Sequence, residues 1–442
     1  MKKITLLLTV LFTSALLNAQ TSYMLHGFDM VPQSSYSNPA YISDSNTVVG
    51  FPLLSSWSAS VYSTGFTFND LFDERPGSDS LYLDLGNVVG EPGGLNYLTG
   101  SVDNDLIHLG FKVKNSYLST GIRHRLLVRG FYVNDLIELI WYGNTSAKDR
   151  QIDLGPSNLQ SDHFVSYYLG LAFPIGNRVS IGARVNLNRG MSNVSTVYND
   201  TRLLTEENDA SAYAVYAETK FLIHTSGLSP DSSDNNFNPL SYYYNYRNFG
   251  VSLDLGADIE ITERVSVNFS FLDFGYINWN SRLKSFENKY DTINFEGIYV
   301  DDEVTDNGIM STYADSLESI IDVNELSEAY RSDLPARLIV GAEYYNLDRT
   351  NRISFLFSGR FMEDYFEPSF SLAFDKTVAY YFAFKVAYTY HRFAPFNLGA
   401  GLVFNVGPLQ LYFMSDNVLS VINYRSQKYV NFHCGVNFVV GE

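Results

Sequence analysis

The feature that most constrains this chain is a strict two-residue alternation of apolar and polar side chains. From Phe249 to Ile261 every second residue is apolar, and the residues between them are Gly, Ser, Asp or Glu. Successive side chains of a β-strand point to opposite faces, so this period predicts a strand with one apolar face. Shorter examples of the same pattern are Val165–Phe173, Val179–Leu187, Leu338–Tyr344, Ile353–Phe361, Phe366–Phe374 and Leu398–Phe404.

The length and the ends of these stretches separate two kinds of β-protein. Strands of a soluble sandwich average about five or six residues, whereas a tilted strand needs about 9 to 11 to cross a bilayer. The stretch from Tyr380 to Tyr390 has an apolar face that begins and ends in tyrosine. Aromatic rings prefer the two membrane interfaces. The pattern therefore predicts an all-β fold, a transmembrane antiparallel β-barrel.

The first twenty residues indicate export. Lys2 and Lys3 precede an apolar run from Ile4 to Leu17, which is the pattern of a secretory signal peptide. We expect residues 1–19 to be the signal, with cleavage between Ala19 and Gln20. The alternative is a buried or membrane-anchoring N-terminal helix. No cysteine follows the cleavage site, so a lipoprotein anchor is not expected.

Composition excludes several function classes. The formal net charge of −18 disfavours a nucleic-acid partner, because phosphate binding needs a basic surface. The single cysteine, Cys434, excludes an intrachain disulfide and a Cys-clustered metal site. Catalytic and phosphate-binding motifs are missing, and the seven histidines are dispersed along the sequence. We therefore expect a non-enzymatic protein without a cofactor or a metal.

Charged residues occur on the polar face of the expected strands. A basic residue directed toward lipid would cost about 2 to 4 kcal/mol at the bilayer midplane, so these side chains should face the lumen. Two interpretations remain open: the charges pair and fill the barrel, or they line a path for a substrate or an ion. The lumen-facing candidates are Arg123, Arg184, Asp254, Asp258, Arg337, Glu343, Arg360 and Lys385.

Two long connections, residues 225–246 and 281–333, should form loops. Between Tyr299 and Asp333, ten acids and one base give a net charge of −9. The spacing of these acids does not match a calcium-binding EF-hand, so a solvated loop is expected rather than a calcium site. Short helices are expected at Asn134–Tyr142, ended by Gly143, and at Phe68–Phe72. Both follow early strands and could close one end of the barrel.

Both ends of the expected barrel carry a family resemblance. The stretches Met30–Tyr41, Leu409–Asn417 and Gly435–Gly441, with Pro335–Arg337, resemble an uncharacterised family of Bacteroidota outer-membrane proteins with a domain of unknown function. The Asn38-Pro39-Ala40 element is also similar to FadL-like transporters and to the PorV and PorP/SprF barrels of type IX secretion.

The FadL resemblance implies a barrel of about 14 strands, with 16 still open, and an N-terminal segment inside the lumen. Residues 20–46 would be this plug-like segment and residues 47–442 the barrel. Proline cannot donate a ladder hydrogen bond and restricts the residue before it, which fits a turn at Asn38-Pro39-Ala40.

The leading functional hypothesis is a barrel in the cell outer membrane that transports or binds a small hydrophobic ligand passively. The alternative is a structural or partner-binding barrel that supports secretion or a cell-surface complex. The expected partners are outer-membrane lipid, a hydrophobic small molecule and a surface or secretion protein, with no nucleic acid.

Overall fold

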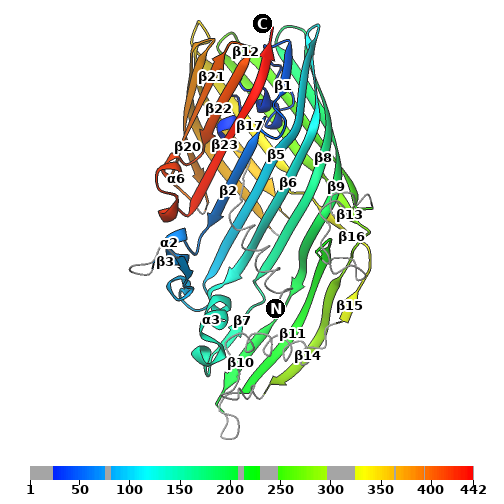
Figure 1. The fold of residues 1–442 in the computed structure, drawn as a ribbon, viewed down its shortest axis with the longest axis vertical. Coiled ribbons are helices and arrows are strands. Elements are labelled where there is room, and N and C mark those ends of the chain that lie inside the picture. Colours follow the sequence, from blue (N-terminus) through cyan, green and yellow to red (C-terminus); the bar gives the residue numbers. More distant parts are fainter. Residues whose placement is uncertain are drawn as a thin grey trace.

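The computed structural model describes residues 23–74, 81–207, 214–228, 247–295, 324–362, 365–392 and 394–441. Within these ranges, antiparallel strands form one sheet that closes on itself where the last strand pairs with the first two (Figure 1). The barrel strands are β1 (Thr47–Gly50), β2 (Trp57–Ser63), β5 (Leu95–Val113), β6 (Ser116–Val133), β8 (Asn158–Ile175), β9 (Val179–Asn199), β12 (Phe249–Thr262), β13 (Val265–Trp279), β16 (Tyr330–Asp333), β17 (Arg337–Tyr345), β18 (Asn351–Phe361), β19 (Phe366–Ala379), β20 (Phe382–His391), β21 (Asn397–Val406), β22 (Leu409–Ser415) and β23 (Tyr429–Val440).

Two positions around this barrel are each built from two strands. Both β1 and β2 pair with β5 on one side and β23 on the other. Both β16 and β17 pair with β13. Counted in this way, the described residues make a 14-stranded barrel. The predicted fold and the number 14 are confirmed, and the alternative of 16 strands is not.

The two ends of the barrel differ. Tight turns such as 114–115, 263–264 and 407–408, together with the C-terminus, lie at one end, which we call the short-turn end. At the opposite end β9 divides its pairing: Val179–Arg189 pair with β12, and Asn193–Asn199 pair with β11. An outer sheet therefore extends beyond the barrel, formed by β7 (Gln151–Asp153), β10 (Arg202–Glu206), β11 (Ala214–Ser226), β14 (Ser285–Phe295) and β15 (Asn324–Leu326).

The alternation in the sequence separates the two faces of the wall. Large apolar side chains on the outward face are exposed, as at Leu169, Leu372 and Leu398. The inward face carries buried polar side chains such as Asn188 and Asn437. Such an arrangement is the reverse of a soluble barrel, whose apolar side chains face inward.

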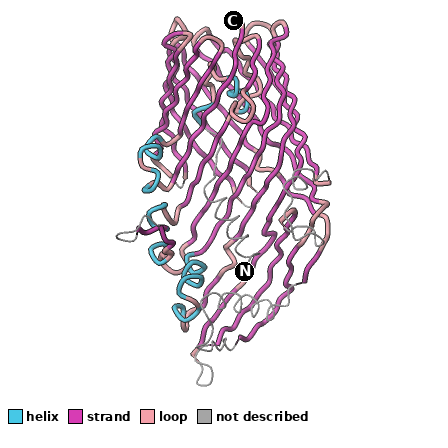
Figure 2. The backbone as a smooth tube through the Cα atoms, in the orientation of Figure 1, coloured by secondary structure: helices cyan, strands magenta, loops and turns pink. Residues whose placement is uncertain are grey.

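An inner segment, residues 23–46, lies inside the barrel near the short-turn end (Figure 2). Its short helices are η1 (Tyr23–Leu25) and η2 (Pro32–Tyr36). Met24 and Phe28 pack in an apolar cluster against Ala387 and Val403 of the wall. The lumen at this level therefore has an apolar core of its own.

The other helices are short and lie toward the end opposite the short turns. They are α2 (Phe68–Leu71), η3 (Gly86–Val88), α3 (Asn134–Tyr142), η4 (Asn144–Ala147), α6 (Val418–Ile422) and η5 (Tyr424–Ser426), beside a two-stranded sheet of β3 (Phe72–Glu74) and β4 (Leu81–Leu83). Helix α3 has the predicted bounds and ends at Gly143 with φ 76°. Its exposed Ile140 and Trp141 show that it does not fill a barrel end.

In the described part of the chain, no helix combines the length and apolar character needed to cross a membrane. The expected signal cleavage between Ala19 and Gln20 lies outside the described residues, as do most of connection 225–246 and residues 296–323 of the acidic connection.

Candidate functional site

The turn Asn38-Pro39-Ala40 fixes the inner segment to the wall. The Asn38 side chain accepts a hydrogen bond from the Ala40 N–H at 3.0 Å and donates one to the Ala257 carbonyl at 3.2 Å. The wall presents two glycines here. A Cβ atom on Gly182 would lie 2.1 Å from the Pro39 carbonyl oxygen, and one on Gly256 would lie 2.1 Å from Asn38 Oδ1. The close approach of the turn therefore requires glycine at both wall positions.

A buried arginine is the centre of the ionic contacts at the short-turn side. Arg352 is 2.8 Å from Asp29 of the inner segment, 3.0 Å from Asp375 and 3.4 Å from Glu343. Beside it, Lys385 Nζ donates to the His26 carbonyl at 2.5 Å. These contacts hold the inner segment to strands β17 to β20 through charge-assisted hydrogen bonds.

A second polar cluster surrounds Tyr36 at the end of η2. The Tyr36 hydroxyl donates to Asp105 at 2.7 Å and lies 3.0 Å from both His108 Nδ1 and the Tyr168 hydroxyl. The Arg123 guanidinium stacks over the Tyr36 ring at 3.9 Å. The inner segment is thus bound to both sides of the lumen.

The wall itself is interrupted between β13 and the strand pair β16–β17. The register of β12 with β13 shifts near Leu253, so that Leu272 and Asp273 are both buried, and Asp273 has a φ of 57°. On the other side of β13, the three residues Leu334–Ala336 join β16 to β17. Proline at 335 has no N–H to donate to the ladder. We call this interruption, bounded by 273–275 and 334–336, the window.

A cavity of about 620 Å³ lies at the window. Its lining includes the outward-facing Phe274 and Phe361. It also includes Arg129 and the buried Ser252, which belong to the inward face of the wall. One cavity is therefore lined by residues from both faces of the wall.

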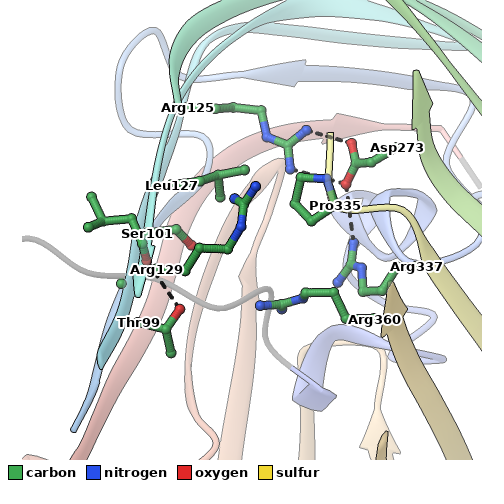
Figure 3. Close-up of a pocket in the computed structure, with 11 residues that line it drawn as sticks. Thr99, Ser101, Arg125, Leu127, Arg129, Asp273, Pro335, Arg337 and Arg360 are labelled. Atoms are coloured by element: carbon green, nitrogen blue, oxygen red, sulfur yellow. Dashed lines mark hydrogen bonds and ion pairs between the residues drawn. The ribbon is translucent and has the colours of Figure 1, made fainter. Parts of the chain in front are cut away.

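Behind the window lies a small cavity with a volume of about 30 Å³, which we call the constriction (Figure 3). Arg125 contacts Asp273 at 2.6 Å and Asp103 at 2.8 Å. Arg337 lies 3.8 Å from the same Asp273. Figure 3 shows Arg125, Asp273 and Arg337 around Pro335, so the inner side of the window carries charged side chains.

A further cavity, of about 710 Å³, lies at the short-turn end. It separates the inner segment from the barrel wall and is lined on one side by Asp29 and Tyr41. Wall residues such as Asp258 and Arg349 line the other side. Nowhere in the described ranges do three or more His, Cys, Asp or Glu side chains come together as metal ligands would.

Comparisons with known proteins identify the family. A family model with the description "Family of unknown function (DUF5723)" matches residues 39–416. The chain belongs to the DUF5723 family. Curated proteins gave no match.

Solved structures with a similar backbone share little sequence identity with this DUF5723 chain. The Ralstonia pickettii toluene transporter TbuX is 9% identical with a TM-score of 0.45, and the alignment covers 95% of this chain and 100% of that chain. A Pseudomonas aeruginosa FadL homologue is 12% identical with a TM-score of 0.45, covering 96% and 100%. The P. putida toluene transporter TodX is 10% identical with a TM-score of 0.46, covering 95% and 100%.

The eight lumen-facing candidates of the DUF5723 chain are distributed among several contacts. Only Arg184 and Asp254 form an ion pair with each other, at 3.6 Å. Four of the eight contact the inner segment: Arg123 stacks on Tyr36, Arg184 donates to the Ser35 carbonyl, Glu343 accepts from the Tyr41 hydroxyl, and Lys385 donates to the His26 carbonyl. Glu343 pairs with Arg352, Arg337 with Asp273, and Arg360 with Glu367 at 3.7 Å, while Asp258 lines the short-turn cavity.

Sequence reasoning did not single out several residues that organise this site. Arg352, Asp273 and Asp162 were not among the candidates, although the alternation places Arg352 on the inward face next to Ile353. The contact between His124 and His163, whose Nε2 atoms are 2.6 Å apart, was also missed. It joins neighbouring strands, so separation along the sequence conceals it.

Proposed function

We propose that this DUF5723 protein is a non-enzymatic outer-membrane barrel that passes a small hydrophobic molecule from outside the cell sideways into the membrane through the window. The short-turn end then faces the periplasm, since tight turns are typical of that side. The exposed apolar outer face of the wall supports the membrane placement. A closed antiparallel barrel can also lie in a membrane because it satisfies its backbone hydrogen bonds internally.

The window cavity is the observation that carries this proposal. A route straight to the short-turn end would meet the inner segment, which is fixed by the glycine contacts at Asn38–Ala40 and by the ion pair between Arg352 and Asp29. A route through the window meets mainly apolar lining, including Phe274, Leu334 and Phe361. An apolar molecule favours the second route because transfer into an apolar environment is favourable.

Aromatic side chains occupy the lumen on the outer side of the constriction. Tyr97 and Phe131 lie 5.0 Å apart between ring centroids, and Tyr365 lies within 5.7 Å of Tyr97. Aromatic faces of this kind suit an apolar ligand that enters from outside.

Chemical blocking of the window tests the proposal. In a Cys434→Ser background, Ala336→Cys places a thiol in the lining of the window cavity. Cells with a lipopolysaccharide outer leaflet are given N-phenylnaphthylamine, whose fluorescence rises as it enters the membrane. Labelling with benzyl methanethiosulfonate should slow this uptake, and a reductant should restore it.

The matched control is Leu402→Cys, an outward position on β21 away from the window. Labelling there should leave uptake unchanged. Equal uptake by cells with and without the protein would refute the transport function. Inhibition by both labelled variants would refute the route through the window.

A partner-binding barrel is the second candidate, favoured by the exposed face of α3. Ile140, Trp141 and Tyr142 are all exposed on this helix beyond the barrel. Adjacent exposed aromatic residues are typical of protein interfaces. Under this alternative, Trp141→Ser should abolish co-purification of a surface or secretion protein while the barrel still assembles.

A further inference from the structure

One arginine lies where three cavities of the lumen meet. Arg129, near the outer end of β6, lines the window cavity and the constriction behind Pro335. It also lines a third, small cavity of about 40 Å³ together with the aromatic residues Tyr97, Phe131 and Tyr365. Arg129 is therefore shared by the aromatic lining, the constriction and the window.

Arg129 has few attachments. A guanidinium has five N–H donors, and the contact recorded for Arg129 in the described chain is a single one of 3.3 Å to Asp162. Arg125, two residues earlier on the same strand, makes three hydrogen bonds, to Asp103 and to both oxygens of Asp273. Arg125 is therefore fixed, whereas Arg129 is held at one point.

The partner of Arg129 keeps other hydrogen-bond donors when this contact breaks. Asp162 is fully buried, yet it also accepts hydrogen bonds from Asn193 Nδ2 at 2.8 Å and from Ser332 Oγ at 3.1 Å. Removal of one partner of a buried ion pair is costly because it leaves a buried charge uncompensated. Here the carboxylate keeps two donors when the arginine moves, and these offset part of that cost.

The contact also reaches the edge of the window. Ser332 belongs to β16, two residues before Leu334. Its hydroxyl accepts a hydrogen bond from Trp279 of β13 at 2.9 Å and donates to Asp162. Arg129, Asp162 and Ser332 thus connect β6, β8 and the strand that borders the window.

We propose that Arg129 is the gate of the window and that its ion pair with Asp162 holds the gate closed. This inference rests on the proposed function. In the closed position a charged guanidinium lies beside the mainly apolar lining of the window, and an apolar molecule can pass only when this side chain turns away. The long, flexible arginine side chain allows this movement without a change in the backbone.

The test measures uptake of N-phenylnaphthylamine by the full-length protein and three variants. Arg129→Ala removes the gate, and Asp162→Asn removes the charge that holds it while it retains an oxygen acceptor for Asn193. Each should raise the uptake rate about fivefold, as expected for loss of one hydrogen-bonded ion pair. The double variant should be no faster than either single variant, because both changes act on one contact.

The matched control is Arg202→Ala on the outer sheet, where the arginine pairs only locally with Asp200. Its uptake rate should equal that of the unaltered protein. Heat-modified migration on a gel checks that every variant is folded. Arg129→Lys retains the charge and should stay close to the unaltered rate, which separates gating from a loss of packing.

The outcomes distinguish the gate from the transport function. If the unaltered protein takes up the dye and both Arg129→Ala and Asp162→Asn take it up at the same rate, the gate is overturned. The transport function then still stands. Independent, multiplied effects in the double variant would also overturn the gate. No uptake by any form would refute the proposed function and the gate together, whereas uptake only after Arg129→Ala would support both.

Discussion

The attachment of the inner segment can be tested with a single methyl group. Gly182→Ala adds a Cβ atom that would lie 2.1 Å from the Pro39 carbonyl oxygen and 2.3 Å from the Pro39 carbonyl carbon. These are backbone atoms, so no rotamer change relieves the contact. The turn must retreat by about 1 Å or more before ordinary van der Waals distances return.

The energetic cost follows from the contacts that this retreat breaks. Overpacking costs about 1 to 3 kcal/mol. The retreat also weakens the hydrogen bonds from Ser180 Oγ to the Ala40 carbonyl and from Asn38 to the Ala257 carbonyl, at about 1 kcal/mol each. A total of about 3 kcal/mol would raise the detached population of the inner segment about 100-fold.

Limited proteolysis reports this population, because cleavage follows the equilibrium fraction of the open form when reclosing is fast. Chymotrypsin should cut after Phe28 or Tyr36 far faster in Gly182→Ala, as measured by mass spectrometry. The control is Gly401→Ala, whose Cβ would lie 3.2 Å from the flexible end of Met24. Equal cleavage of the two variants, or loss of the folded gel band in Gly182→Ala, would refute the reasoning.

Three other perturbations have defined outcomes. Arg352→Met leaves Asp29, Glu343 and Asp375 without their shared cation, and should destabilise the barrel by about 3 to 5 kcal/mol, seen as a lower temperature for loss of the folded gel band; an unchanged temperature would contradict this. Burial lowers the pKa of His26 from 6.5 to about 4, so its neutral form is favoured in the folded state and stability is lost as pH falls below 6.5, by about 2 kcal/mol at pH 5. Hydrogen exchange of residues 23–46, corrected for its intrinsic pH dependence, should accelerate over this range and should not do so in His26→Gln. Leu372→Arg places a charge on the exposed apolar wall and should reduce folding into lipid vesicles by about 2 to 4 kcal/mol, whereas Leu347→Arg at a short turn should fold normally.

The strands could be predicted because their signal is local. The alternation in Phe249–Ile261 can be read from neighbouring residues, because successive side chains point to opposite faces of the wall and the outward face is apolar. The turn at Asn38–Ala40 also has a local origin in proline geometry. The glycines that receive it, Gly182 and Gly256, lie far away in sequence, and the alternation marks them only as inward positions.

Long-range partners required the structure. The alternation places Arg129 and Arg352 on the inward face, but it cannot show that Arg352 meets Asp29, which is 323 positions away. Asp273 did leave a local signal, since the period slips by one residue between Phe271 and Phe274. Such a slip indicates a bulge in a strand, but it does not indicate which neighbouring strand opens beside it.

Two backbone donors at the edges of the window have partners within the protein. A missing ladder bond is costly in a membrane because no water replaces it. Pro335 has no N–H, the Asp273 N–H donates to the Asp254 carboxylate at 2.7 Å, and the Leu334 N–H donates to the Gly275 carbonyl at 2.9 Å. These two donors therefore need no ligand to satisfy them.

An opening that is stable when empty needs a separate stopper, or small molecules and ions would leak through it. Arg125 is tied to both Asp103 and Asp273 and forms the frame of the constriction rather than a moving part. Arg129 is adjacent to this frame, reaches the window cavity and is held by one contact. A gate requires both a rigid charged frame and one loosely held guanidinium. The frame sets the size of the opening, and the single ion pair sets how often the opening is unblocked.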